Sequence, residues 1–216
     1  MPTRAMIVVG GGSSTRFGTN KLLAEVAGRP LIAHTIDAVA RHVDRCVVVC
    51  RAEITPRVEA LSDGVTITQG GVSRTLSEMA GLAALGGEAD LIGIHDAARP
   101  AVDGDLIDRL FSTAWDHGGA IPLIATEGMI IDRKTHRPVE GLRRAQTPQV
   151  FRGPDLMMAY VKAAQAGFEG HDTSEVMEEF SDVTIVGVPG DRANVKVTYP
   201  QDLDLVRATL TARSGT

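Results

Sequence analysis

Residues 5–23 read AMIVVGGGSSTRFGTNKLL, and this stretch decides the class of fold that we expect. Five apolar residues in a row lead into three consecutive glycines, which is the pattern of a buried strand that ends in a tight loop. A run that is apolar at every position is typical of a strand covered on both faces, as in a parallel sheet. We therefore expect an α/β fold that begins with this strand.

The same alternation continues along the chain. Short β-branched runs and segments of helical periodicity follow one another, which predicts a mostly parallel sheet flanked by helices. We expect strands near 5–9, 45–50, 65–68, 91–95, 120–125 and 183–188. We expect helices over 31–41, 73–85, 106–115, 154–166, 174–180 and 201–212. A chain of 216 residues is within reach of one α/β domain, so we expect a single domain over 1–216.

One segment interrupts this alternation. Residues 126–144, TEGMIIDRKTHRPVEGLRR, are polar, rich in turn-forming residues and without helical periodicity. We expect an extended hairpin that leaves the main body. An arm that reaches a second subunit and an ordinary surface loop are both typical of such a segment. The apolar run Met129, Ile130, Ile131 favours burial against a second copy, and hence a homodimer.

Composition excludes several classes of partner. The net charge of −5 and the 4% content of aromatic residues argue against a nucleic-acid binder. No apolar run has the length of a membrane span.

The two cysteines, Cys46 and Cys50, are too far apart along one strand for a disulfide. We expect both as buried, reduced thiols, which fits a cytoplasmic location.

The first candidate site is the glycine loop that follows the first strand. Glycines let the backbone approach phosphate oxygens, and Arg16 and Lys21 behind them can neutralise a triphosphate. A tight turn without a ligand explains the glycines alone, but the two cations favour phosphate. The motifs of P-loops and dinucleotide folds are both incomplete here. The nucleotide-binding candidates in the loop are Gly10, Gly11, Gly12 and Ser13.

A second glycine turn lies in QGGVSRTLSEM, residues 69–79. The helix after Gly70 carries Arg74 and Ser77 in its first turns. A helix N-terminus suits anionic groups, and a serine hydroxyl can bind a base edge. An ordinary strand–turn–helix unit explains the same spacing equally well.

The third segment, IHDAARP at residues 94–100, places Asp96 directly after an apolar strand. Ligands of open α/β sheets bind at this edge, and an acidic residue there can hold Mg²⁺ for phosphoryl transfer. Arg99 can meet a phosphate. We expect His95 to be a packed strand residue.

The last two segments are RRAQTPQVF at residues 143–151 and NVKVTYPQDL at residues 194–203. Thr147 precedes a proline and is held extended, with its hydroxyl free for a ligand. Lys196 lies between two valines in a strand-like run. Its side chain can face solvent, or it can point into the cleft as a fixed positive charge.

Taken in order, these five segments resemble the 2-C-methyl-D-erythritol 4-phosphate cytidylyltransferase family, over residues 5–207. HDAARP, TPQ-x-F and N-x-K-x-T-x-P-x-DL carry the resemblance as a set. The resemblance implies a Rossmann-like α/β sheet with a projecting β-arm, at 126–144, that makes a homodimer. It also implies that CMP passes from CTP to a small alcohol phosphate, with release of pyrophosphate.

The resemblance further implies roles on the nucleotide side of the site. By matching position, Arg16 and Lys21 stabilise the pentavalent α-phosphate. The residues implied to line the cytosine and the loop are Gly70, Arg74 and Ser77.

On the alcohol side, the resemblance implies that Asp96 binds Mg²⁺ and a substrate hydroxyl. Arg99 and Thr147 are then near the phosphate of the alcohol, and Lys196 positions that phosphate for attack.

The arm departs from the family pattern. Residues 126–129 read TEGM where the family carries D-T-[IM]-K, and Val139 stands at the position of an expected arm arginine. A related cytidylyltransferase for ribitol 5-phosphate or another polyol phosphate is therefore an alternative. Two further alternatives are a non-catalytic nucleotide-binding protein of the same fold and a nucleotide-dependent oxidoreductase, although the incomplete glycine fingerprint disfavours the oxidoreductase.

Overall fold

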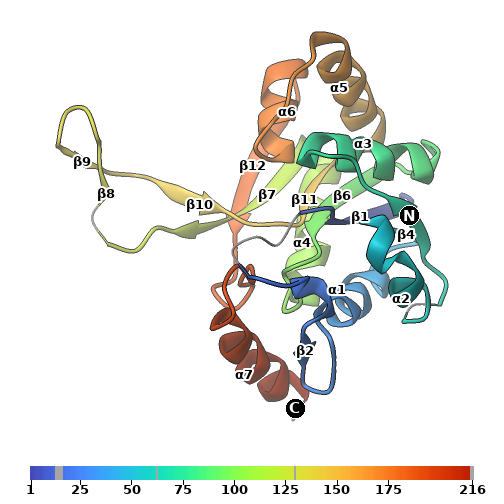
Figure 1. Cartoon of the computed structure of the whole chain (residues 1–216). Helices are drawn as coiled ribbons and strands as arrows, with labels where there is room; N and C mark the ends of the chain where they lie inside the picture. Colours follow the sequence, from blue (N-terminus) through green and yellow to red (C-terminus); the bar gives the residue numbers. More distant parts are fainter. Residues whose placement is uncertain (13–16, 62, 129, 215–216) are drawn as a thin grey trace.

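The computed structural model describes residues 1–12, 17–61, 63–128 and 130–214, and Figure 1 shows the whole chain. The strands are β1 (Arg4–Gly10), β2 (Glu25–Val26), β3 (Arg29–Pro30), β4 (Arg45–Cys50), β5 (Thr66–Gln69), β6 (Leu91–Asp96), β7 (Gly118–Ala125), β8 (Ile130–Ile131), β9 (Pro138–Val139), β10 (Arg143–Ala145), β11 (Gln149–Arg152) and β12 (Thr184–Pro189). The α-helices are α1 (Leu31–Ala40), α2 (Thr55–Glu59), α3 (Arg74–Leu85), α4 (Gly104–His117), α5 (Gly153–Ala166), α6 (Thr173–Phe180) and α7 (Asp202–Ser214). Two short 3₁₀ helices are η1 (Lys21–Leu23) and η2 (Ala52–Ile54).

The central sheet has eight strands in the order β10-β7-β11-β6-β1-β4-β5, with β12 paired to β7. Four of its pairings are parallel, and three, all of which involve β10 or β11, are antiparallel. The expected α/β fold with a mostly parallel sheet is confirmed, and the sheet is mixed because β11 runs against its neighbours.

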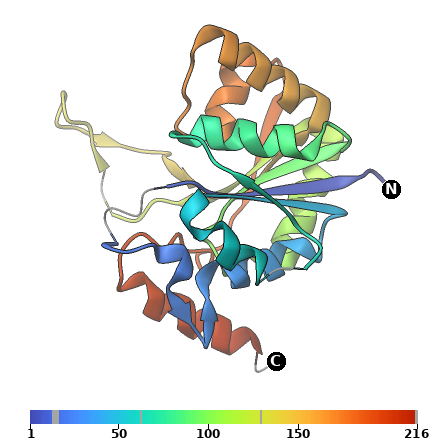
Figure 2. The same ribbon diagram turned by 45° about the vertical axis from the view of Figure 1, so that its right-hand side comes forward.

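Both faces of the sheet are buried, as the apolar runs predict. In β1, Met6 and Val8 pack into one cluster with α1 and α4, whereas Ala5 and Ile7 pack into a second with α3, α5 and α6. Figure 2 shows the two helical layers on opposite faces of the sheet. Alternate residues of a strand point to opposite faces, so each layer receives every second side chain.

Two of the predicted helices, α3 and α6, begin at a side-chain cap. Ser73 caps α3 by accepting a hydrogen bond from the backbone N–H of Leu76. Asp172 caps α6 by accepting a hydrogen bond from the backbone N–H of Glu175. Among the described helices, none has both the length and the apolar character that a membrane span requires.

The segment after β7 forms the expected arm. β8 and β9 pair with each other as an antiparallel hairpin, and the chain returns through β10, which pairs with β7. Figure 1 shows this hairpin projecting well beyond the sheet. Cys46 and Cys50 are free, buried thiols, as expected.

Candidate active site

Three loops that follow parallel strands meet at one edge of the sheet. β1 ends at Gly10, β5 ends one residue before Gly70, and β6 ends at Asp96. The parallel register pairs β1 with β6 and with β4, which in turn pairs with β5, so the carboxyl ends of the four strands lie side by side. This is the edge where ligands of open α/β sheets bind.

A buried carboxylate lies at the centre of this edge. Asp96 is 5% exposed, and three cations surround it. Oδ1 lies 2.7 Å from Nη1 of Arg74, and Oδ2 lies 3.2 Å from Nε of Arg99. Nζ of Lys196 lies 2.9 Å from the same Oδ2. Arg74 and Lys196 lie far from Asp96 and Arg99 in the sequence, and the fold brings all four together.

The electrostatics of Asp96 follow from these contacts. Burial by itself raises the pKa of the Asp96 carboxyl, but the charges of Arg74, Lys196 and Arg99 outweigh burial and hold the pKa well below its usual range. The carboxylate is therefore ionised at neutral pH. Three cations, Arg74, Arg99 and Lys196, lie around this one carboxylate, which leaves this edge suited to phosphate groups.

The hydroxyl of Thr147 is not free, which corrects the sequence-based expectation. It is buried, accepts a hydrogen bond from the backbone N–H of Asp96 at 3.0 Å, and lies 3.0 Å from Nδ1 of His95. Thr147 therefore holds the end of β6 in place. His95 is fully buried, as expected for a packed strand residue, and burial lowers the pKa of its imidazole to about 4.

The two glycine turns close on Ser77. A Cβ added to Gly11 would lie 2.5 Å from the Ser77 hydroxyl, and one added to Gly70 would lie 2.9 Å from it. The hydroxyl donates to the carbonyl of Ser73 at 2.8 Å, and Ser77 is 1% exposed. A base edge can therefore reach only the acceptor lone pairs of Ser77. A Cβ on Gly12 would meet nothing within 4 Å, so this glycine is not required by packing.

The two candidate lysines lie beside each other, and both differ locally from expectation. Lys21 begins η1 rather than lying in a loop, and its Nζ donates to the carbonyl of Val197 at 2.8 Å. Lys196 lies in an extended segment that forms no strand, and its side chain, which is 41% exposed, reaches the Asp96 carboxylate. Ser13 and Arg16 lie outside the described residues.

Sequence reasoning missed several polar groups that frame the site. Arg99 donates to the carbonyl of Asn194 at 2.7 Å, and Asn194 donates to the carbonyl of Thr147 at 2.8 Å. Glu78, one helical turn after Arg74, is 1% exposed and pairs with it at 2.9 Å. The i, i+4 spacing of an arginine and a glutamate was the available signal for this pair.

Few protein side chains at this edge are available as metal ligands. Within the described parts of the chain, no three His, Cys, Asp or Glu side chains form a group that could hold a metal ion. Asp96 offers one carboxylate at the phosphate-binding edge. Mg²⁺ at phosphoryl-transfer sites is commonly held by one or two carboxylates together with substrate phosphates. The residues therefore fit a metal that enters with a triphosphate.

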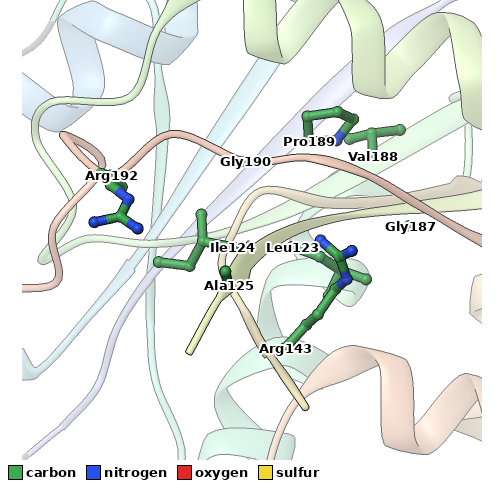
Figure 3. Close-up of a pocket in the computed structure, with 9 residues that line it drawn as sticks. All are labelled: Leu123, Ile124, Ala125, Arg143, Gly187, Val188, Pro189, Gly190 and Arg192. Atoms are coloured by element: carbon green, nitrogen blue, oxygen red, sulfur yellow. The ribbon is translucent and has the colours of Figure 1, made fainter. Parts of the chain in front are cut away.

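A separate pocket lies at the base of the arm. It has a volume of about 500 Å³ and is lined by residues 123–125 of β7, by Arg143, and by residues 187–190 and Arg192. Figure 3 shows the side chains of Arg143 and Arg192 on either side of Ile124. Arg192 is also ion-paired with Glu127. None of the residues expected at the ends of the parallel strands lines this pocket, whereas Arg143 is one of the arm's cations expected to face the alcohol phosphate.

Comparison with known proteins identifies the relatives of this chain. The family model for IspD, 2-C-methyl-D-erythritol 4-phosphate cytidylyltransferase, matches residues 4–212. The protein of that name from Solibacter usitatus is 34% identical to this chain, and the match covers 94% of this chain and 90% of the length of the relative. The bifunctional enzyme IspD/IspF of Granulibacter bethesdensis is 37% identical, and this chain spans 56% of its length.

Solved structures agree with the sequence comparison. The synthase structure from Anaerococcus prevotii superposes with a TM-score of 0.85 at 25% identity, covering 97% of this chain and 99% of the other. The 2-C-methyl-D-erythritol 4-phosphate cytidylyltransferase of Thermus thermophilus superposes with a TM-score of 0.83 at 27% identity, covering 98% of this chain and all of the other. The chain therefore belongs to the 2-C-methyl-D-erythritol 4-phosphate cytidylyltransferase family.

Proposed function

We propose that this protein transfers CMP from CTP to 2-C-methyl-D-erythritol 4-phosphate in isoprenoid precursor synthesis. The observation that carries this proposal is the convergence of Arg74, Arg99 and Lys196 on Asp96, beside two glycine turns. A reaction between two phosphate-bearing substrates needs such a concentration of positive charge. Membership of the family supports the same reaction.

The proposed chemistry is an in-line displacement. A phosphate oxygen of the alcohol phosphate attacks the α-phosphorus of CTP, and a new P–O bond forms. The bond from the α-phosphorus to the bridging oxygen breaks, and pyrophosphate leaves with that oxygen. Arg16 and Lys21 stabilise the charge on the α-phosphate, while Lys196 orients the attacking phosphate.

The remaining residues bind the two substrates. The glycine turns, with Arg74 and Ser77, form the nucleotide side, whereas Asp96 and Arg99 face the alcohol. Thr147 acts through the backbone of Asp96. Asp96 is the residue that would hold Mg²⁺, which when bound neutralises part of the triphosphate charge.

Pyrophosphate release tests this function directly. Each of the four nucleoside triphosphates is assayed against methylerythritol phosphate, ribitol 5-phosphate and other polyol phosphates, with and without EDTA. We expect CTP with methylerythritol phosphate to be fastest. Other nucleotides should be about 5- to 150-fold slower for each hydrogen bond to the base that they cannot form. Excess EDTA should abolish turnover.

Each other outcome of this assay has a defined meaning. Equal turnover of all four nucleotides would show that the enzyme does not select cytosine, and full activity in EDTA would show that the reaction needs no divalent metal. Faster reaction with ribitol 5-phosphate would favour the alternative substrate, which the departure at Val139 motivates. CTP binding without turnover would indicate a non-catalytic nucleotide-binding protein.

We also propose that the arm forms a homodimer in which it covers the partner's alcohol-phosphate site. Ile131, Val139 and Leu142 on the arm are 45%, 36% and 43% exposed, and a second copy would bury them. The arm's arginines and lysine supply positive charge for the phosphate. The buried free thiols support a cytoplasmic location.

Lysine substitutions on the arm test the dimer. Ile131→Lys with Val139→Lys should give monomers with weaker alcohol-phosphate binding but near-normal CTP binding, because the apolar contact would have to bury charge. Light scattering and isothermal titration measure both properties. Val161→Lys, which places the same charge on a 49% exposed apolar residue of α5 away from the arm, serves as the control. A fully active, monomeric wild-type protein would refute the proposal.

A further inference from the structure

Glu78 is a buried carboxylate with no direct contact to Asp96 and a full set of partners. Its Oε1 lies 2.9 Å from Nε of Arg74 and accepts a hydrogen bond from the Thr173 hydroxyl at 3.1 Å. Its Oε2 accepts from the Tyr160 hydroxyl at 2.5 Å. Tyr160 and Thr173 belong to α5 and α6, so this carboxylate joins α3 to the helices packed beside it.

The same helices are tied back to the segment that follows β10. Gln149 donates to the Asp172 carboxylate at 2.9 Å and accepts from the backbone N–H of Ser174 at 2.9 Å. These two hydrogen bonds fix the start of α6 on either side of Thr173. Thr147, two residues before Gln149, in turn accepts from the backbone N–H of Asp96.

These interactions close a ring around one guanidinium group. Starting from Asp96, the ring passes through Arg74, Glu78 and Thr173 to α6, and returns through Gln149 and Thr147. Each member is held from two sides. A planar guanidinium with a carboxylate beside each of two nitrogens is restrained in its rotation.

One nitrogen of that guanidinium, Nη2, has no hydrogen-bond partner in the part of the chain that the structure describes. Nη1 of Arg74 donates to Asp96 at 2.7 Å. Nη2 is buried and lacks a hydrogen-bond partner among the described residues. Nε meets Glu78 as an ion pair at 2.9 Å, although the angle is not that of a hydrogen bond. A buried donor without an acceptor points to a ligand that supplies one.

We propose that Glu78, held by Tyr160 and Thr173, is a positioning residue that orients Arg74 so that Nη2 meets an acceptor of the bound nucleotide. This inference rests on the proposed function, because it takes CTP as the ligand. Glu78 touches no reacting atom and acts only through Arg74. A purely structural ion pair is the alternative, and it would stabilise the fold without favouring either substrate.

The test separates positioning from stability. Glu78→Gln keeps the size of the side chain but removes its charge, so Arg74 should lose its fixed orientation. We expect the KM for CTP to rise about tenfold, with kcat and the KM for the alcohol phosphate within about twofold of wild type. Glu175→Gln is the matched control and should change neither KM, because the carboxylate of Glu175 in α6 accepts from the nearby His171 backbone N–H and makes no contact with Arg74 among the described residues.

A double-mutant cycle supplies the decisive readout. In an Arg74→Ala background, Glu78→Gln should leave the KM for CTP unchanged, because the group through which it acts is missing. An equal effect in both backgrounds would refute positioning. So would a Glu78→Gln protein with an unchanged KM for CTP, or one in which all kinetic constants fall together with the melting temperature.

A second variant and a binding measurement also test the role of Glu78. If Glu78→Gln does not fold, Tyr160→Phe takes its place, because it removes one hydroxyl group that donates to Glu78. This variant should raise the KM for CTP about threefold. An unchanged KM for CTP would refute the inference. Calorimetric titration of CTP alone separates this inference from the proposed function. Wild-type protein that binds no CTP would refute the proposed function, whereas tight binding that Glu78→Gln and Tyr160→Phe leave unchanged would refute only the role of Glu78.

Discussion

Replacing Lys21 by alanine is expected to lower kcat by about two to three orders of magnitude, as when other groups that stabilise a transition state are removed. The proposed reaction gathers negative charge on the α-phosphate, and Lys21 lies at the start of η1 beside the glycine loop. Its Nζ lies next to the segment that carries Lys196, because it donates to the carbonyl of Val197. The substitution should therefore slow the chemical step, which kcat measures.

The fold should tolerate this change, and a second lysine provides the control. Lys162 in α5 also donates to a backbone carbonyl, that of Phe180 at 3.2 Å, on the far helical layer. Lys162→Ala removes a similar hydrogen bond, worth about 1 kcal/mol, without removing charge from the site. Steady-state kinetics and thermal melts compare the two variants. Near-normal turnover by Lys21→Ala would remove Lys21 from the catalytic residues.

Replacing Asp96 by asparagine should reduce both stability and activity. The carboxylate is 5% exposed, so its removal breaks the ion pair of Arg99 and leaves Arg74 with Glu78 alone as a carboxylate partner among the described residues. Breaking a buried ion pair from one side costs about 3–5 kcal/mol. We also expect kcat/KM to fall at least about 100-fold, because Asp96 orients the cations and is the proposed metal ligand.

Urea unfolding measures the decrease in stability, and Asp108→Asn is the matched control. Asp108 pairs with Arg4 at 2.8 Å, but its side chain is 52% exposed, so its replacement should cost no more than about 1 kcal/mol. Equal decreases in the two variants would contradict our account of the Asp96 cluster.

The pH dependence of the Asp96 contribution has a definite sign. The native pKa of its carboxyl lies well below the unfolded value of about 3.9. Its stabilisation is therefore fully present above that unfolded value and is lost only as the pH falls through the lower native pKa. The difference between wild type and Asp96→Asn should be constant around neutral pH and should shrink in acid.

The sequence by itself determined the order of strands and helices and the place of the arm. These features rest on local signals, such as the apolar run of 5–9 and the Asp172 cap, which act within a few residues of the chain. The expected strand at 45–50 is found at Arg45–Cys50. The arm was predictable because its sequence lacks the periodicity that burial requires.

Only the tertiary structure placed β11 between β6 and β7. Its four residues lie directly before α5, and nothing local marks them as a strand. Pairing with two strands formed far earlier in the chain makes them one. The same holds for α2, a helix of only five residues that the sequence did not reveal.

For the candidate site too, the sequence predicted some features and the fold decided the others. Positions after a predicted strand identified Asp96 and Arg99 as candidates, and a strand-like run between two valines identified Lys196. These are local features of the sequence. Their convergence, the engaged hydroxyl of Thr147 and the burial of Glu78 were decided by the fold. Lys196 and Asp96 lie far apart in the sequence, and no local signal states which cation meets which carboxylate. That pairing arises only when the strand ends are brought to one edge of the sheet.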